Sequence, residues 1–138
     1  MEQLFHASTV SIDGRGVMIC GASGSGKSSL ALRLMSIGAR LVADDQTMIE
    51  QRNDGLWAMA PGPLQGMIEA RGVGLLNAPF QEEVRLSLVV DLDLRESDRL
   101  PPRRERCLAG VNLPLVLGQG TDHFPSAILH FARHGRRE

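Results

Sequence analysis

The 138-residue chain has no tyrosine, one tryptophan and four phenylalanines, so aromatic residues make up only 4% of it. A hydrophobic core must therefore consist mainly of aliphatic side chains, and the hydrophobic fraction of 43% supplies them. The sequence also lacks any apolar run close to the ~20 residues that a membrane-spanning helix needs. Its first residues, MEQLFHASTV, lack the basic start and long apolar stretch of a signal peptide. We therefore expect a globular, cytoplasmic protein that does not act at a membrane.

Neither positive nor negative charge dominates, because the chain has 15 Lys and Arg residues and 16 Asp and Glu residues, which give a formal net charge of −1. This balance gives no electrostatic reason for nucleic acid to be the main partner. Cys20 and Cys107 do not form a metal-binding spacing, and they agree with a reducing cytoplasm. The length favours one compact domain, since it is too short for two ordinary ones.

A short apolar run changes into a stretch rich in glycine and serine within the sequence GVMICGASGSGKSSLAL. Residues 17–20 suit a buried strand, because none of them needs contact with water. Residues 21–28, GASGSGKS, match the phosphate-loop pattern G-x-x-x-x-G-K-[ST] at every fixed position. Apolar residues then recur at helical spacing up to Ile37, and Gly38 stands where a helix needs a C-terminal cap. The pattern predicts a strand, a phosphate-binding loop and a helix in succession.

Such a loop binds phosphate because glycines let the backbone turn sharply and bring its N–H groups close to phosphate oxygens. The positive end of the following helix points at the same anion, Lys27 adds a full charge, and the Ser28 hydroxyl is a suitable magnesium ligand. We therefore expect a nucleoside triphosphate, ATP, together with Mg²⁺. The predicted nucleotide-binding residues are Gly21, Ala22, Ser23, Gly24, Ser25, Gly26, Lys27 and Ser28.

The rest of the chain alternates short β-type segments with turns. We expect strands at residues 9–12 and 39–45, a hairpin over residues 46–60, and a central strand over residues 84–94, VRLSLVVDLDL. The remaining segments are expected to be a loop at residues 61–66, irregular structure at residues 67–77, and short pieces beyond Asp98, where Pro101, Pro102 and Pro114 break the chain. With the phosphate loop, this predicts an α/β fold with a mixed central sheet flanked by helices.

Two acidic pairs follow β-type runs in the sequence. Asp44 and Asp45 end the stretch RLVADD, whereas Asp91 and Asp93 lie in LSLVVDLDL. Phosphate-loop enzymes commonly hold magnesium partly through an Asp at the end of a second apolar strand. Carboxylates directly after a buried strand meet the loop at the strand ends, so one of Asp44 and Asp45 suits metal binding through water and the other proton acceptance. Asp91 and Asp93 alternate on one polar strand face, and we interpret them as structural.

The sequence GASGSGKSSLALRLMSIGARLVADD, followed by MIEARGVGLLN, resembles HPr kinase/phosphorylase, the bifunctional enzyme that phosphorylates a serine of the phosphocarrier protein HPr. The resemblance runs from His6 to about Pro114, and the close succession of its parts is more specific than the phosphate loop alone. It implies a phosphate-loop fold similar to phosphoenolpyruvate carboxykinase. It also implies one catalytic domain over residues 1–138, without the N-terminal domain of longer members, and an HPr-type phosphocarrier of the phosphotransferase system as the partner.

The resemblance further implies roles for individual residues. Asp45 matches the acceptor of the serine proton, and His6 matches an upstream histidine suited to hydrogen-bond it, although Ala7 replaces the glycine that follows in the family. Arg99 matches a catalytic arginine, although a proline stands two residues later where the family has glycine. The implied catalytic residues are His6, Lys27, Asp44, Asp45 and Arg99, and the implied metal ligands are Ser28 and Glu69.

The sequence departs from the family at a proline-rich loop of the type PVRPGRN, which is associated with phosphorolysis of phosphoserine-HPr. The aligned residues 114–120, PLVLGQG, contain neither arginine, so we expect a serine kinase with weak or absent phosphorylase activity. Two other functions stay open: a small-molecule kinase or nucleotide hydrolase with the same loop, and a nucleotide-gated binding module without phosphotransfer. The sequence is compatible with a homo-oligomer and does not indicate a number of subunits.

Overall fold

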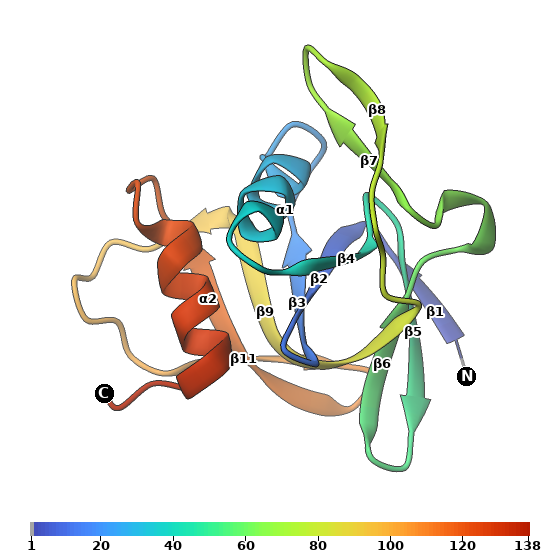
Figure 1. Cartoon of the computed structure of the whole chain (residues 1–138). Coiled ribbons are helices and arrows are strands. Elements are labelled where there is room, and N and C mark those ends of the chain that lie inside the picture. Colours follow the sequence, from blue (N-terminus) through green and yellow to red (C-terminus); the bar gives the residue numbers. More distant parts are fainter. Residues whose placement is uncertain (1) are drawn as a thin grey trace.

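The computed structural model describes residues 2–138, which form a mixed β-sheet with two α-helices on one of its faces (Figure 1). The sheet has the strand order β1-β5-β6-β9-β3-β2-β4, and β11 also pairs with β9 while β10 pairs with β11. Strands β7 and β8 form a separate hairpin that projects from the rest. The elements follow along the chain as β1 (Glu2–Phe5), β2 (Ala7–Ile12), β3 (Arg15–Cys20), α1 (Lys27–Ser36), β4 (Arg40–Ala43), β5 (Thr47–Arg52), β6 (Gly55–Met59), a 3₁₀ turn (Gly62–Leu64), β7 (Met67–Ala70), β8 (Gly74–Asn77), β9 (Glu83–Arg95), β10 (Arg104–Leu108), β11 (Val111–Gly118) and α2 (Phe124–His134).

Strand β9 is the centre of the sheet, which confirms the central strand that the sequence predicts over residues 84–94. It pairs with β3 and with β11 in parallel, and its first residues pair with β6 in antiparallel. The carboxyl ends of parallel strands meet at one edge of a sheet, which is where ligands bind in open α/β folds. The chain leaves β3 at this edge and enters the glycine-rich segment that leads to α1.

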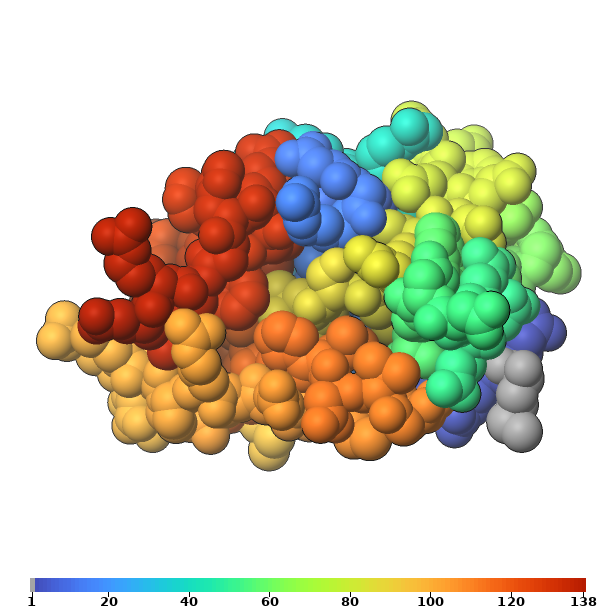
Figure 2. Space-filling model, turned by 90° about the horizontal axis from the view of Figure 1, so that it is seen from below, coloured from blue at the N-terminus to red at the C-terminus, as the bar shows by residue number. Residues whose placement is uncertain are grey.

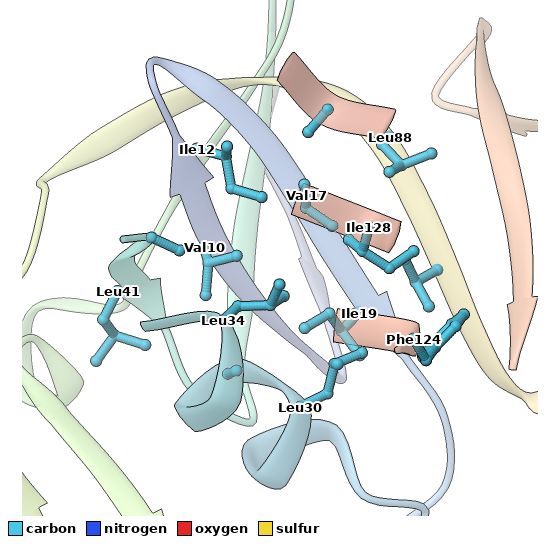
Figure 3. Packing of buried hydrophobic residues seen from close by; sticks show 14 of the residues in the cluster. Val10, Ile12, Val17, Ile19, Leu30, Leu34, Leu41, Leu88, Phe124 and Ile128 are labelled. Atoms are coloured by element: carbon cyan, nitrogen blue, oxygen red, sulfur yellow. The ribbon is translucent and has the colours of Figure 1, made fainter. Parts of the chain in front are cut away.

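The central strands are buried on both faces, because their side chains alternate between two hydrophobic clusters. Val17 and Ile19 of β3 belong to the cluster under the helices, where they pack with Leu34 of α1 (Figure 3). Met18 and Val89 belong to the cluster on the other face, which β5, β6, β10 and β11 cover. Both clusters consist almost entirely of aliphatic side chains, as the scarcity of aromatic residues requires.

The C-terminal residues lie against the segment that precedes β10 (Figure 2). The Arg103 guanidinium donates hydrogen bonds to the carbonyl oxygens of Arg136 and Arg137, at 3.3 and 3.2 Å. Arg136 donates in return to the carbonyl oxygens of Pro101 and Pro102. These contacts bring together two arginine-rich stretches that lie about thirty residues apart in the sequence.

Several local predictions are confirmed. The hairpin over residues 46–60 is β5–β6, the strand over residues 39–45 is β4, and residues 9–12 lie in β2. Gly38 has φ +118° just after α1, and its N–H donates to the Met35 carbonyl oxygen, so it ends the helix as expected. Within the described residues, neither helix has the length and apolar character that crossing a membrane requires.

Two local predictions are wrong. Residues 67–77 form the β7–β8 hairpin. Gly72, at φ +85°, lies in its turn, and Gly74, at φ +143°, begins β8, so the glycines that suggest irregularity let the chain reverse between two strands. The chain beyond Asp98 forms β10, β11 and α2 rather than short pieces. Pro125 lies in the first turn of α2, where its missing N–H has no intrahelical partner to lose.

We expect Leu34→Ala to lower the free energy of unfolding by about 2–5 kcal/mol, because the Leu34 side chain is fully buried between α1 and the sheet. Urea denaturation followed by circular dichroism measures this change. Leu100→Ala is the matched control: Leu100 is exposed, and its truncation is expected to change stability by less than about 0.5 kcal/mol. Equal losses in the two variants would contradict the packing of α1 on the sheet.

Candidate functional site

Residues 21–28, here called the phosphate loop, turn sharply between β3 and α1. Gly24 and Gly26 have φ values of +82° and +103°, which side chains rarely adopt, and a Cβ at either position would meet no atom within 4 Å. The space over these glycines is therefore open. A Cβ at Gly21 would lie 2.3 Å from Ser25 Oγ, so the beginning of the loop packs against its end. The loop is a cradle whose backbone a ligand can approach closely.

The positive end of α1 faces this cradle. No side chain caps the N-terminus of α1 and no acidic residue lies in its first turn, so its first N–H groups keep their capacity to bind an anion. The Lys27 side chain is only 5% exposed, and its Nζ donates hydrogen bonds to the carbonyl oxygens of Gly21 at 2.8 Å and Ala22 at 3.2 Å. The ammonium group is thus held by the loop itself. This arrangement is suited to binding phosphate.

Asp44 is a buried carboxylate that follows β4 and accepts hydrogen bonds from three other segments. Its Oδ1 accepts from Ser8 Oγ at 2.8 Å and from Ser28 Oγ at 2.7 Å. Its Oδ2 accepts from the Glu69 backbone N–H at 3.0 Å. A buried carboxylate is tolerated where hydrogen-bond donors satisfy its oxygens. Asp44 therefore places a carboxylate oxygen directly beside the hydroxyl of the phosphate loop.

Asp45 has the opposite environment although it is the next residue. Its φ of +67° turns the backbone, and the Gln46 N–H donates to the Asp44 carbonyl oxygen at 2.7 Å across this turn. The Asp45 side chain is 59% exposed, and its Oδ1 lies 2.7 Å from His6 Nε2. The contact between His6 and Asp45 that the sequence suggests is therefore present. An exposed carboxylate paired with an imidazole is suited to accept a proton from a bound substrate.

These residues surround a cleft of about 470 Å³ at the carboxyl edge of the sheet, a volume typical of small-molecule sites. The predicted site residues that line it are Ser23, Gly24, Gly26, Lys27, Ser28, Asp44, Asp45 and Glu69. The sequence analysis does not single out the other lining residues, which are Ser29, Gln46, Leu64, Met67, Arg71 and Leu75.

Some predicted site residues lie outside the lining of the cleft. Gly21, Ala22 and Ser25 form the part of the loop that packs on itself and contacts Lys27. His6 reaches the cleft through Asp45. Arg99 lies in an exposed bend after β9 and is not among the lining residues, so its catalytic role stays a prediction. Arg71, two residues after Glu69 in IEARG, is a lining cation that sequence reasoning missed, because the hairpin that orients it was not expected.

The residues present fit a magnesium ion that accompanies a nucleotide. Among residues 2–138, no group of three or more His, Cys, Asp or Glu side chains is arranged to hold a metal alone. Mg²⁺ is usually held by one or two protein carboxylates together with substrate phosphates and water. The Ser28 hydroxyl beside Asp44, with the Glu69 side chain lining the same cleft, is a donor set of this kind.

Neither Cys20 nor Cys107 is among the residues that line the cleft. Cys20 ends β3 next to the phosphate loop, but burial raises the pKa of its thiol to about 11, in spite of the opposing Arg106 guanidinium. The thiol is therefore protonated at neutral pH, and only the thiolate is a strong nucleophile.

A family model and several curated proteins match the sequence of this chain. The family model described as the HPr Serine kinase C-terminal domain matches residues 1–108. The HPr kinase/phosphorylase of Geobacillus sp. strain WCH70 is 39% identical over 113 residues, covering 73% of this chain and 36% of the relative. That of Shouchella clausii is 42% identical over 100 residues, covering 64% of this chain and 31% of the relative. The chain thus spans about a third of the length of these curated relatives.

A solved structure shares the fold. The Hpr(Ser) kinase/phosphatase from Coxiella burnetii superposes with a TM-score of 0.81 at 27% sequence identity, covering 95% of this chain and 88% of that chain. This agreement extends beyond residue 108, where the family match ends, and it confirms the mixed α/β architecture that the sequence predicts.

We expect Asp45→Gly to be at least as stable as Asp45→Ala, because φ +67° costs a residue with a Cβ about 1–2 kcal/mol. Both changes remove the carboxylate, so their difference in urea denaturation reports only the backbone strain. Glu82→Gly and Glu82→Ala are the control pair, since Glu82 is exposed and is not among the positive-φ residues. There the usual order is expected, with alanine the more stable. The usual order at Asp45 as well would contradict the strained turn.

Proposed function

Because the chain belongs to the HPr serine kinase family, we propose that it is an ATP-dependent protein-serine kinase that phosphorylates an HPr-type phosphocarrier of the phosphotransferase system. The observation that carries this proposal is the exposed Asp45 carboxylate, which lies beside His6 at a cleft that also contains the phosphate loop. The names of the relatives, HPr kinase/phosphorylase, support the substrate class. Residues 1–138 act in this proposal as one catalytic domain.

Each side chain at the cleft has a distinct part in the proposed reaction. The N–H groups of the phosphate loop and the Lys27 ammonium bind and orient the phosphates of ATP. Bound ATP supplies the transferable phosphoryl group, and bound Mg²⁺ neutralises its charge. Ser28 and Glu69, which line the cleft, would hold the ion, and Asp44, which lies beside the Ser28 hydroxyl, would bind it through water.

Proton transfer in this proposal belongs to Asp45. Its carboxylate takes the proton from the hydroxyl of the substrate serine, which makes the oxygen a better nucleophile. His6 hydrogen-bonds the same carboxylate and holds its orientation. The left-handed backbone at Asp45 separates this task from that of Asp44, since it turns one carboxylate outward while the other stays buried. Arg99 keeps its proposed role of steadying charge on the transferred group, provided that substrate binding brings it to the cleft.

The cleft is better suited to a protein kinase than to either of the two alternative functions. The His6 and Asp45 side chains are 49% and 59% exposed, so a serine on a large partner can reach them without entering an enclosed pocket. A nucleotide hydrolase would release phosphate from ATP without any added protein. A nucleotide-gated binding module would bind ATP and form no labelled product with any partner. We further propose that the protein acts in the cytoplasm, and that neither nucleic acid nor a membrane takes part in its function. A homo-oligomer is compatible with this proposal.

The reverse reaction, phosphorolysis of the phosphorylated partner, is proposed to be weak. It brings two anions together and needs more cations than the forward reaction. Residues 114–118 lie within β11 rather than in a loop, and the aligned segment supplies no arginine. Arg71 is a cation that lines the cleft besides Lys27, and it limits how completely the activity is lost.

Labelled ATP, Mg²⁺ and an HPr protein test the proposed function, with mass spectrometry to identify the labelled serine. We expect Asp45→Asn to lower the transfer rate by ~10²–10⁴-fold while ATP affinity changes little, because an amide does not accept the serine proton. Asparagine also tolerates the left-handed backbone, so the fold is kept. Glu69→Gln is the matched acid-to-amide comparison, and it is expected to raise the Mg²⁺ concentration needed instead. Equal effects of both changes on the Mg²⁺ titration would defeat this division of roles.

We expect phosphorolysis to be much slower than the forward reaction. The measurement supplies the phosphorylated partner with Mg²⁺ and inorganic phosphate, and it follows pyrophosphate formation. A rate comparable to the kinase rate would contradict the prediction. In that event, Arg71→Gln shows whether the cation lining the cleft is responsible.

A further inference from the structure

Asp93, which the sequence suggests is structural, contacts the phosphate loop directly. It lies near the end of β9, and both of its carboxylate oxygens accept the Ala22 backbone N–H, at 2.9 Å for Oδ1 and 3.1 Å for Oδ2. The two residues are 71 positions apart in the sequence. A charged acceptor makes this hydrogen bond stronger than a bond between two neutral groups.

The other end of the same peptide group binds the loop lysine. The Ala22 N–H and the Gly21 carbonyl belong to one peptide unit, and the Gly21 oxygen accepts a hydrogen bond from Lys27 Nζ at 2.8 Å. One peptide plane thus lies between a carboxylate and an ammonium group, and each hydrogen bond polarises the peptide in the sense that strengthens the other. We propose that Asp93 is a positioning residue, which sets the Lys27 ammonium for phosphate binding by fixing the orientation of the Gly21–Ala22 peptide.

Irregular pairing of β9 accompanies this placement of Asp93. Leu117 of β11 is the partner of Asp91, and the next residue, Gly118, is the partner of Arg95, so residues 92–94 of β9 are an insertion relative to β11. Bulges of this kind redirect side chains, and they are frequent next to active sites. An alternating pattern places Asp91 and Asp93 on one face, and it does not show such a redirection.

An ion pair lies at the base of the bulge. Arg106 of β10 donates to Asp91 Oδ2 at 2.6 Å, and the Asp91 side chain is only 10% exposed. The other oxygen, Oδ1, accepts the Asp93 backbone N–H at 2.9 Å. The carboxylate that contacts the loop therefore has its own backbone held by a neighbour that is anchored in the sheet.

The peptide needs this restraint because Gly21 lacks a Cβ and has φ +154°. A glycine offers the peptide alternative orientations that other residues exclude. If the Gly21–Ala22 peptide rotates, Lys27 Nζ loses its 2.8 Å partner and keeps only the longer hydrogen bond to the Ala22 carbonyl oxygen, at 3.2 Å. The negative charge of Asp93 by itself would repel phosphate, so a purely electrostatic role predicts that its neutralisation strengthens ATP binding. A positioning role predicts weaker binding.

This inference deepens the proposed function, since it concerns the same nucleotide site, and calorimetric titration with Mg²⁺-ATP tests it without a protein substrate. Asp93→Ala is expected to weaken ATP binding about tenfold, the effect of losing one charge-assisted hydrogen bond. Asp93→Asn keeps an acceptor oxygen, and it is expected to restore much of the affinity. Glu82→Gln, at the opposite end of β9, removes the same charge and should bind as the wild type does.

A double-mutant cycle with Lys27→Ala separates positioning from general damage to the loop. If Asp93 acts through Lys27, Asp93→Ala causes no further loss of affinity in the Lys27→Ala protein. Losses that multiply in the double variant would overturn the proposal, as would wild-type affinity of Asp93→Ala or tighter binding by Asp93→Asn. A wild-type protein that does not bind ATP would refute the proposed function.

NMR of the nucleotide-free protein tests the hydrogen bond between Ala22 and Asp93 independently of ATP binding. The Ala22 amide proton is expected to lie downfield in the NMR spectrum of the wild type, because its acceptor is a carboxylate, and to lie further upfield in Asp93→Asn, whose acceptor is a neutral amide. Glu82→Gln should leave the Ala22 resonance unchanged. An Ala22 amide that shows the same shift in wild type and Asp93→Asn would overturn the inference even if ATP binds as proposed.

Discussion

The buried carboxylate of Asp44 holds the site together. It accepts hydrogen bonds from Ser8 in β2, from Ser28 in α1 and from the Glu69 backbone in β7, which are 36, 16 and 25 residues away in the sequence. A carboxylate at this depth is tolerated only while its donors remain, because the loss of a donor leaves a buried charge poorly compensated. The Asp44 side chain therefore links the sheet, the first helix and the β7–β8 hairpin, which also share one hydrophobic cluster, and the cleft lies where they meet.

Neighbouring residues have different chemical properties here because of a single backbone angle. Asp44 and Asp45 are the same residue type and adjacent in sequence. Asp44 is nevertheless buried among hydrogen-bond donors, whereas Asp45 is largely exposed beside His6. The positive φ of Asp45 is the local cause. Strain of this kind persists only where surrounding contacts fix the chain, and the Ser8 hydroxyl, which accepts the Asp45 N–H while donating to Asp44, is such a contact.

The parts of this architecture that short-range patterns determine could be predicted from the sequence. The strand and helix on either side of the glycine-rich loop, the apolar run of β9 and the turn between β5 and β6 each depend on residues close together in the sequence, and the structure confirms these elements. Phosphate binding by the loop stays a prediction. The sequence did not predict what depends on distant pairing. The glycines of the β7–β8 hairpin suggest irregular structure, and the prolines beyond Asp98 suggest short pieces in the region where α2 forms. Asp93 contacts Ala22 at the point where β9 bulges against β11, and no pattern of alternation contains that information.

Parallel pairing of β3 with β9 also has a consequence for how the chain folds. The strand that leads into the phosphate loop lies about seventy residues before its central partner, so a long segment must be closed before they meet. Closure of long loops makes folding slow, and non-local strand pairs form late. During synthesis, the loop emerges well before β9 exists. A nascent chain thus has the glycines and the lysine of the loop long before it has the strand that pairs beside them, and we expect it to bind a ligand only once β9 is in place.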